Sequence, residues 1–422
     1  MADFGRALLG VLFFLFIALL FSEDRRRIPW RVVAGGLALQ LGAALLFVFF
    51  PPATHLLLLA GKAAHALETA TDAGAGFVFG YLGGAAAPFE TKTPGASFIL
   101  AFRALPMVLT ISALAALFFH WGVLQRVCDG FAFLLRRIMG ISGPLAVGAA
   151  AHILVGMIEA PLLIRPYLPR MSRGELFALM SCGMAGVAGT VMVIYAGFLA
   201  PLLANAMGHI LIASVIATPA ALAVAAMISP WTPCSENEGV ALILVDPPVG
   251  AFDAIIRGVA DGVAPIVGIV SVLLTTIALV TLVNMLLGLL PSIDGAPASL
   301  QMVFALPFRP ITWLMGVPWS ETGTAAALMA TKTVLNEFVA YRDLSALGAA
   351  ALSPKSRLIL TYALCGFANF GSMGILVGGL NAMLPERRAE IVALGMKSIL
   401  AGTLATCMSA TVAGFLFTLK GF

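Results

Sequence analysis

The sequence predicts an all-α, polytopic membrane protein with about eight transmembrane helices, two re-entrant helical hairpins, inverted structural repeats and interfacial helices. Hydrophobic residues make up 61% of the 422 residues and charged residues only 10%, against about 25% charged residues in soluble domains. Residues 176–235 contain no Asp, Glu, Lys or Arg, which is enough for two spans of about 20 residues each. Two further apolar segments are interrupted by prolines and each holds a glutamate. A soluble enzyme is excluded.

The first apolar run, Leu8–Phe21, predicts a retained span and not a cleaved signal peptide. The basic cluster of Arg25, Arg26, Arg27 and Arg31 follows this run instead of preceding it. Because cytoplasmic loops are enriched in Arg and Lys, the N-terminus is expected outside the cell. Hydropathy predicts further full spans and two interfacial helices, the latter near 55–82 and 125–137. The full spans are expected near 7–22, 32–50, 98–120, 176–202, 208–228, 262–291, 357–384 and 392–418.

The chain is expected to divide into an N-terminal scaffold and two repeats. The scaffold covers residues 1–142, the first repeat 143–257 and the second 258–422. Each repeat should contain a segment too short or too often interrupted for a full span. These segments are 143–158, at the start of the first repeat, and Pro307–Asp343, which follows the long span that opens the second. Where a helix is interrupted at membrane depth, its free backbone N–H and C=O groups need hydrogen-bond partners from protein or water. These segments therefore predict re-entrant hairpins that are buried in protein or line a watery cavity.

The two repeats echo each other around an acidic residue. Glu159 lies in Gly-Met-Ile-Glu-Ala-Pro, and Glu337 lies in Leu-Asn-Glu-Phe. A Cys-Gly-x-Ala run follows in each repeat, at 182–189 and at 365–372. Interrupted apolar segments in corresponding positions of two halves are typical of a transporter's midplane binding site. A carboxylate at membrane depth costs about 2.5–3.5 kcal/mol, so it normally has a functional reason.

The second repeat offers the more polar site. Glu337, Asn369 and Ser372 combine a carboxylate, an amide and a hydroxyl, a set suited to the vicinal hydroxyls of a sugar. The alternative for Glu337 is a structural ion pair with Lys332. In the first repeat His152 precedes Glu159 by seven residues, and it is either a packing residue or a proton carrier.

Other classes of function find little support in the sequence. Neither a nucleophile–base pair nor a phosphate-binding loop is evident, and the five cysteines lie too far apart for a metal site or a disulfide framework. An intramembrane enzyme is therefore disfavoured, and no metal, cofactor or nucleic-acid partner is expected. A passive channel remains an alternative, although it would not need two polar clusters at a repeat interface.

Several motifs, in order along nearly the whole chain, resemble those of the concentrative nucleoside transporter family. They are Gly-x-x-Glu-Ala-Pro-Leu-Leu-Ile-Arg-Pro-Tyr at 156–167, Met-Gly-Val-Pro-Trp at 315–319, Asn-Glu-Phe-Val-Ala-Tyr at 336–341 and Cys-Gly-Phe-Ala-Asn-Phe-Gly-Ser at 365–372. The resemblance implies eight transmembrane helices, two re-entrant hairpins and a homotrimer with one pathway per protomer. It further implies cation-coupled symport of nucleosides into the cell, across the plasma membrane or, in a bacterium, the inner membrane.

The resemblance also assigns the substrate contacts residue by residue. It places the nucleobase against Met157, Ile158, Glu159 and Val191, with Phe367 packing on the base. It gives the ribose hydroxyls to Glu337, Asn369 and Ser372. This chain has Met157-Ile158 where the family commonly carries Gln-Thr, so two polar contacts to the base are missing. Base selection should therefore be looser or shifted.

A second departure concerns the coupling ion. The resemblance places the ion region at His152, Val155, Gly186 and Val187, beside Glu159. His152 stands at the position of an Asn ligand and Gly186 at that of a Ser ligand in sodium-coupled members, so two oxygen ligands are lost. This predicts proton coupling through Glu159 or His152. The alternatives are sodium coupling, or a carrier for a modified nucleoside or another hydroxylated solute.

Overall fold

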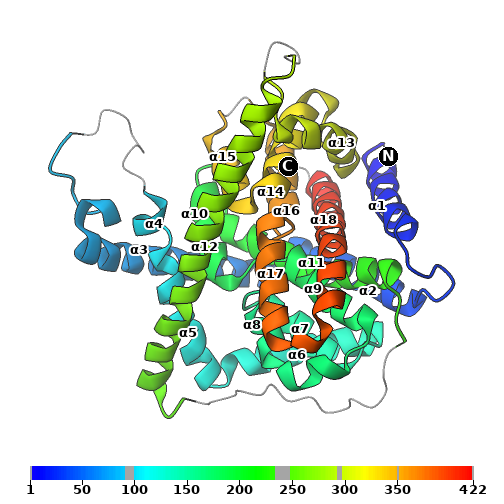
Figure 1. Cartoon of the computed structure of the whole chain (residues 1–422), viewed down its shortest axis with the longest axis horizontal. Coiled ribbons are helices and arrows are strands. Elements are labelled where there is room, and N and C mark those ends of the chain that lie inside the picture. Colours follow the sequence, from blue (N-terminus) through cyan, green and yellow to red (C-terminus); the bar gives the residue numbers. More distant parts are fainter. Residues whose placement is uncertain (1, 91–98, 233–247, 292–296, 349–350, 421–422) are drawn as a thin grey trace.

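The protein is helical throughout the part of the chain that can be described. The computed structural model describes residues 2–90, 99–232, 248–291, 297–348 and 351–420, and every regular element in them is an α- or 3-10 helix. Figure 1 shows long helices running between two ends of the molecule, with shorter helices gathered near each end. Cys234 and most of the polar loop around it lie outside the described residues.

The described residues contain helices for each of the eight spans that the sequence predicts. Seven helical stretches among the described residues are long and apolar enough to cross a membrane. The eighth span consists of α16 and α17, whose apolar α17 is too short to cross alone. Five spans are single helices: α1 (Ala2–Leu20), α2 (Trp30–Phe49), α11 (Ala206–Ile228), α12 (Ala251–Leu287) and α18 (Arg388–Leu419). A sixth combines the short α4 (Leu100–Arg103) with α5 (Pro106–His120).

Two spans are broken in the middle. The first consists of α9 (Arg173–Ala185) and α10 (Gly189–Leu199), and the second of α16 (Pro354–Leu364) and α17 (Phe370–Met383). Both breaks fall in the Cys-Gly-x-Ala runs that the sequence singles out. The short 3-10 helices are η1 (Gly80–Gly83), η2 (Arg165–Arg170), η3 (Trp319–Glu321) and η4 (Pro385–Arg387).

A short helical hairpin precedes each broken span. Hairpin 1 consists of α7 (Gly143–His152) and α8 (Glu159–Leu163), and hairpin 2 of α14 (Thr322–Val334) and α15 (Glu337–Ala346). Hairpin 2 begins later than the expected start at Pro307. That proline and Pro310 lie inside a separate helix, α13 (Leu300–Met315), because each removes a single backbone donor and the remaining helical bonds persist. Gly316, with φ +114°, ends this helix.

The two halves repeat element by element. The series α5, α6 (Val123–Met139), hairpin 1, α9–α10 and α11 corresponds to α12, α13, hairpin 2, α16–α17 and α18. In this correspondence the first repeat includes α5 and α6, which precede the expected boundary at 143, and the second begins with α12 at Ala251, before the expected 258. The corresponding helices pack on each other, α5 on α12 and α11 on α18. In Figure 1, α6, α7 and α8 lie near the lower end and α13, α14 and α15 near the upper end. The repeats are therefore inverted, and the hairpins enter from opposite ends.

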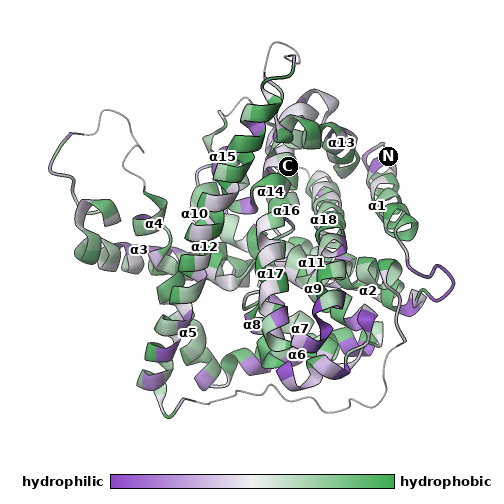
Figure 2. Ribbon diagram, viewed as in Figure 1, coloured by the Kyte–Doolittle hydropathy of each residue, from purple (hydrophilic) through white to green (hydrophobic). Residues whose placement is uncertain are grey.

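Two helices have the mixed composition expected of interfacial segments. They are α3 (Pro51–Phe79) and α6, which both contain charged residues among apolar ones. In Figure 2 the lower end of the molecule, where α6 lies, alternates purple and green, whereas α12 is largely green and white. Interfacial helices have this composition because one side contacts lipid and another contacts water.

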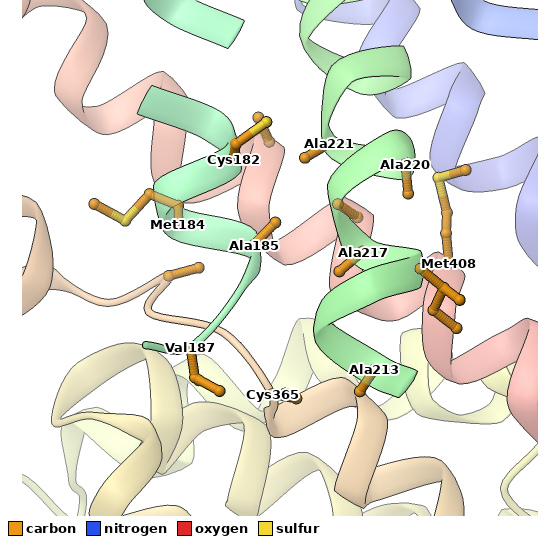
Figure 3. Packing of buried hydrophobic residues seen from close by; sticks show 14 of the residues in the cluster. Cys182, Met184, Ala185, Val187, Ala213, Ala217, Ala220, Ala221, Cys365 and Met408 are labelled. Carbon is orange, nitrogen blue, oxygen red and sulfur yellow. The ribbon is translucent and has the colours of Figure 1, made fainter. Parts of the chain in front are cut away.

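Small side chains allow the central helices to pack closely. Nearly every residue of α11 is buried, and Figure 3 shows Ala213, Ala217 and Ala221 on the part of this helix near α9 and the α16–α17 break. On α18, a Cβ at Gly402 would lie 2.6 Å from Cβ of Met184 on α9. Small residues at helix contacts are typical of membrane proteins because they let backbones approach.

A charged network ties four segments together at the lower end of the molecule. The carboxylate of Glu23, in the loop after α1, accepts hydrogen bonds from both Nε and Nη2 of Arg173 at 3.2 and 3.0 Å. It also accepts from Lys397 Nζ at 2.8 Å and from Ser229 Oγ at 2.9 Å. The hydrogen bonds from Arg173 are the main reason that the pKa of Glu23 falls from 4.5 to about 2. The network joins the α1–α2 loop to α9, α11 and α18.

We expect Glu23→Gln to lower the thermal stability of the solubilised protein at pH 7, by less than about 1 kcal/mol because the site is partly exposed. The folded protein holds the pKa of Glu23 below its ordinary value, so its contribution is present above pH 4.5 and is lost as the pH falls toward 2. The difference in melting temperature between variant and wild type should therefore shrink between pH 5 and pH 3. Asp129→Asn, at an exposed acid on α6, is the control. A difference independent of pH would contradict this role.

Candidate functional site

The two helix breaks meet at the centre of the molecule. The backbone N–H of Phe367, between α16 and α17, donates to the carbonyl oxygen of Gly186, between α9 and α10, at 3.2 Å. A Cβ at Gly366 would lie 2.9 Å from the carbonyl oxygens of both Met184 and Ala185, so only glycine permits this approach. At each break some backbone groups lack a partner within their own helix. Here a donor of one break pairs with an acceptor of the other.

Glu337 is the buried acid of this region. It is the first residue of α15 and its side chain accepts two short hydrogen bonds, from Tyr195 Oη on α10 and from Asn369 Nδ2 before α17, both at 2.8 Å. Only 5% of its surface is exposed. Hydrogen bonds to a charged group are the strong ones, so these two fix the position of the carboxylate. Each of the two carboxylate oxygens keeps a further lone pair, which can accept a hydrogen bond from a hydroxyl group.

Asn369 links this carboxylate to the start of α17. Its Oδ1 accepts the backbone N–H of Ser372 at 2.7 Å, so Asn369 caps the helix, while its amide nitrogen serves Glu337. Asn336 caps α15 in the same way through the N–H of Val339 at 3.0 Å. Two helix N-termini therefore begin beside one carboxylate, and the partial positive charge of a helix N-terminus favours an anionic or oxygen-rich group there.

Lys332 does not pair with Glu337. Its ammonium group is fully buried and donates to the carbonyl oxygen of Ala363 at 2.7 Å and to Thr406 Oγ1 at 3.2 Å. Ala363 belongs to the last turn of α16, where helical carbonyl groups lack intrahelical donors. The alternative of a direct ion pair between Lys332 and Glu337 is therefore not observed, and Lys332 instead holds hairpin 2 against α16 and α18.

The tip of hairpin 1 packs against α9, α10 and α17 of the two broken spans. A Cβ at Gly183 of α9 would lie 3.1 Å from both Met157 Cβ and His152 Cε1. A Cβ at Gly189, the first residue of α10, would lie 2.5 Å from the carbonyl oxygen of Leu154. Ile158 contacts Gly379 of α17. Both hairpin tips therefore touch α10 and the α17 span.

The residues of the expected ion region are not all gathered at the first break: His152 packs on Gly183 of α9, whereas Val155 packs on the small cluster of Cys128, Ala151 and Ala160. His152 is buried, and its Nε2 has no hydrogen-bond partner. Val187 is buried, whereas Val155 and Gly186 are partly exposed. The Gly186 carbonyl already accepts the N–H of Phe367. Within the described ranges, no group of three or more His, Cys, Asp or Glu side chains could hold a metal ion.

Glu159 differs from Glu337 in its surroundings. It begins α8, and its side chain folds back over Gly156 so closely that a Cβ there would overlap the carboxylate. No cationic side chain of the described chain forms an ion pair with it, and the charged side chain that acts on it is another acid, Asp261 of α12. Glu159 and Glu337 therefore do not share a hydrogen-bonded partner, although each stands at a hairpin tip.

The structure joins some of the residues that the sequence singles out. Glu337, Asn369 and Ser372 form one connected group, and Phe367 lies beside it in the same break. Met157 and Ile158 lie at the contacts of hairpin 1 with α9 and α17, and Val191 is buried in α10. Sequence reasoning missed Tyr195, which lies 142 residues before Glu337. A weak signal is its phenol hydroxyl in the largely apolar α10, where Thr190 is the other hydroxyl-bearing residue.

Three family models match the chain. The model described as "Na+ dependent nucleoside transporter N-terminus" matches residues 9–82, and its C-terminal counterpart matches 209–414. A third, described as "Nucleoside recognition", matches 101–202. Together they cover both hairpins, both breaks and the N-terminal helices.

Relatives of similar length align over nearly the whole chain. An uncharacterized transporter of Haemophilus influenzae is 35% identical over 417 residues, covering 97% of this chain and 96% of the relative. The putative nucleoside permease NupX of Escherichia coli is 33% identical over 98% of this chain and 99% of the relative. The rat solute carrier family 28 member 3 is 34% identical over 96% of this chain, which spans only 58% of that longer protein.

Solved structures are similar in fold to this chain over its full length. CNTnw in an inward-facing substrate-bound state is 34% identical, with a TM-score of 0.88. The alignment covers 100% of this chain and 99% of the CNTnw chain. A doubly substituted CNTnw in an outward-facing state gives a TM-score of 0.87 at 34% identity, with the same coverage. The fold is thus shared across the chain.

Inverted repeats with paired hairpins and broken spans define a secondary membrane transporter. The chain belongs to the concentrative nucleoside transporter family, a family of cation-coupled transporters. The family resemblance expected from the motifs is confirmed.

We expect Asn369→Ala to destabilise the protein more than the loss of an ordinary helix cap. Removing a cap costs about 0.5–2 kcal/mol, and here the buried Glu337 carboxylate would also lose one of its two donors. Thermal unfolding in detergent measures the effect, with Ser299→Ala as control, because Ser299 caps α13 without contacting a carboxylate. Combining Asn369→Ala with Glu337→Gln should restore part of the loss. Additive effects of the two substitutions would show that the Asn369–Glu337 bond contributes nothing.

Proposed function

We propose that this protein carries nucleosides into the cell by symport with a proton. The observation that carries the proposal is the group of Glu337, Asn369 and Tyr195 at the meeting point of two helix breaks. Glu337 retains acceptor capacity, and Asn369 and Ser372 add polar atoms beside it. We assign the ribose hydroxyls to Glu337, Asn369 and Ser372.

The nucleobase is assigned to the contact between hairpin 1 and the broken spans. Met157, Ile158 and Val191 offer apolar surface there, Phe367 offers an aromatic ring, and Glu159 offers the one carboxylate. A base held mainly by apolar groups is selected less sharply than one held by buried polar groups. This supports a carrier that accepts several bases.

Proton coupling is supported by the character of the ion region. A small hard cation prefers several oxygen ligands, whereas here His152 presents a ring nitrogen without a partner and Gly186 presents no side chain. Histidine and glutamate both exchange protons. Sodium coupling is the second candidate, favoured by the descriptions of the matching family models and by the mouse relative named sodium/nucleoside cotransporter 1.

The orientation follows from the distribution of basic residues. The loop after α1, the α6 helix and the start of α9 and of α18 lie at the end of the molecule that holds Arg25–Arg27, Arg137 and Arg173. The positive-inside rule makes this end cytoplasmic and places the N-terminus outside. Labelling of a cysteine introduced at Arg27 by an impermeant reagent, only from the inside, tests the orientation in the plasma or bacterial inner membrane.

A homotrimer is the proposed assembly. Apolar side chains are exposed on several sides of α12, among them Leu274 and Met285, each 68% exposed. Such a helix can contact lipid on one side and a second copy on another. Light scattering of the solubilised protein measures the stoichiometry, and a monomer would contradict the trimer.

We expect Glu337→Gln to reduce uridine and adenosine uptake about 10- to 100-fold in proteoliposomes, because hydrogen bonds to a charged group are worth about 1.5–3 kcal/mol. Wild-type uptake should follow an imposed proton gradient and ignore a sodium gradient. Asp343→Asn, at a partly exposed acid on the same helix α15, is the control and should transport normally. Unchanged uptake by Glu337→Gln would remove the ribose assignment, and sodium-driven uptake by the wild type would remove proton coupling.

We expect the double substitution His152→Asn with Gly186→Ser to make uptake respond to sodium, because it restores two oxygen ligands beside the first break. A Cβ at Gly186 meets nothing closer than the Cys182 carbonyl oxygen at 3.9 Å, so the serine fits. Initial uptake rates with and without an inward sodium gradient measure the change, and Gly268→Ser in open space on α12 is the control. If the double variant remains active but indifferent to sodium, the ion region has been assigned to the wrong residues.

A further inference from the structure

The helix α6 has three distinct faces. Cys128, Ala132, Leu135 and Met139 are buried against the protein. A second face carries the charged residues Arg126, Asp129, Arg136 and Arg137, all exposed. The third face is apolar and exposed, and it is defined by Val123, Val127, Leu134 and Ile138. This third face gains nothing from contact with water, and the helix as a whole therefore suits the boundary between hydrocarbon and headgroups.

Two exposed tryptophans lie next to this helix and to its neighbour. Trp121 immediately precedes α6 and is 54% exposed, and Trp30 begins α2 and is 61% exposed. Tryptophan is enriched at the headgroup level of a bilayer because its ring is apolar and its N–H is polar. Both residues therefore mark the same boundary that the three faces of α6 indicate.

The first turn of α2 meets the last turn of α6. The Arg31 guanidinium donates to the carbonyl oxygen of Arg137 at 3.5 Å, and a Cβ at Gly140 would lie 3.0 Å from the Arg31 guanidinium carbon. Gly140 ends α6 with φ +71°. This contact places the Arg31 guanidinium group beside the C-terminal turn of α6, which carries Arg136 and Arg137.

These three arginines have no acidic partner in the described part of the chain. The nearby acids of the α1–α2 loop are already engaged, Asp24 with Arg27 and Glu23 with Arg173. No ion pair involves Arg31, Arg136 or Arg137. Exposed guanidinium groups beside exposed aliphatic side chains match a ligand with an anionic head and apolar tails, since guanidinium binds phosphate through paired hydrogen bonds.

We propose that this corner binds an anionic phospholipid such as phosphatidylglycerol. Arg31 and Arg137 contact the lipid phosphate, and Leu134 and Ile138 lie along its acyl chains. The proposal does not depend on the transported substrate. Each basic residue near an anionic membrane surface contributes about 1 kcal/mol, so two of them account for roughly a tenfold to thirtyfold preference.

Native mass spectrometry of the full-length protein, released from mixed phosphatidylglycerol and phosphatidylcholine micelles, tests the proposal. Wild-type protein should retain phosphatidylglycerol in preference to phosphatidylcholine. The double variant Arg31→Gln with Arg137→Gln should lose about tenfold in apparent affinity for phosphatidylglycerol. Arg126→Gln, near the other end of the same charged face, is the matched control and should bind as wild type does.

Competition and folding controls complete the test. Inorganic phosphate at millimolar concentration should not displace the lipid, since it lacks the acyl chains; equal displacement would identify a free-anion site and overturn the lipid proposal. Equal retention of both lipids by the wild type, or unchanged retention by the double variant, would also overturn it. If the double variant elutes as aggregate, Arg137→Gln alone replaces it, with an expected threefold to fivefold loss and the same criteria.

Discussion

A helix interrupted inside a membrane must find partners for the backbone groups that it no longer pairs, and the rest of this structure depends on how the chain meets that requirement. The break between α9 and α10 and the break between α16 and α17 supply partners to each other, as the bond from Phe367 to Gly186 shows. The approach is possible because Gly366 faces the carbonyl groups of α9. Inverted repeats bring equivalent breaks to the same depth in the membrane. A single hydrogen bond can therefore pair a backbone group of one break with a backbone group of the other.

The polar groups of the site follow from this meeting point. Once α17 starts at the second break, Asn369 becomes its cap, and the remaining amide nitrogen reaches Glu337. Tyr195, one helical segment after the first break, reaches the other carboxylate oxygen. A buried carboxylate is therefore held by side chains of both repeats, while the Glu159 carboxylate at the other hairpin tip folds back over the backbone of its own hairpin at Gly156. Glu159 and Glu337 occupy corresponding positions in the two repeats, but the groups that surround their carboxylates differ.

The sequence allowed much of this to be predicted, and its failures have physical causes. The spans, both breaks and the position of each glutamate follow from hydropathy, glycine clusters and internal repetition, which are local properties. The start of hairpin 2 was misplaced at Pro307, since two prolines suggested a break where α13 continues. Tyr195 and the partners of Lys332 could not be found, because hydrogen bonds between segments as far apart as 142 residues leave no periodic trace.

The buried ammonium group of Lys332 limits how the molecule can deform. Moving α14 away from α16 and α18 would leave the Lys332 ammonium group in an apolar interior, with neither the Ala363 carbonyl nor the Thr406 hydroxyl to accept its hydrogen bonds. Leaving a buried charge without acceptors is among the most costly changes in a protein. Separating hairpin 2 from these two helices therefore carries an energetic cost that a displacement of all three elements together does not.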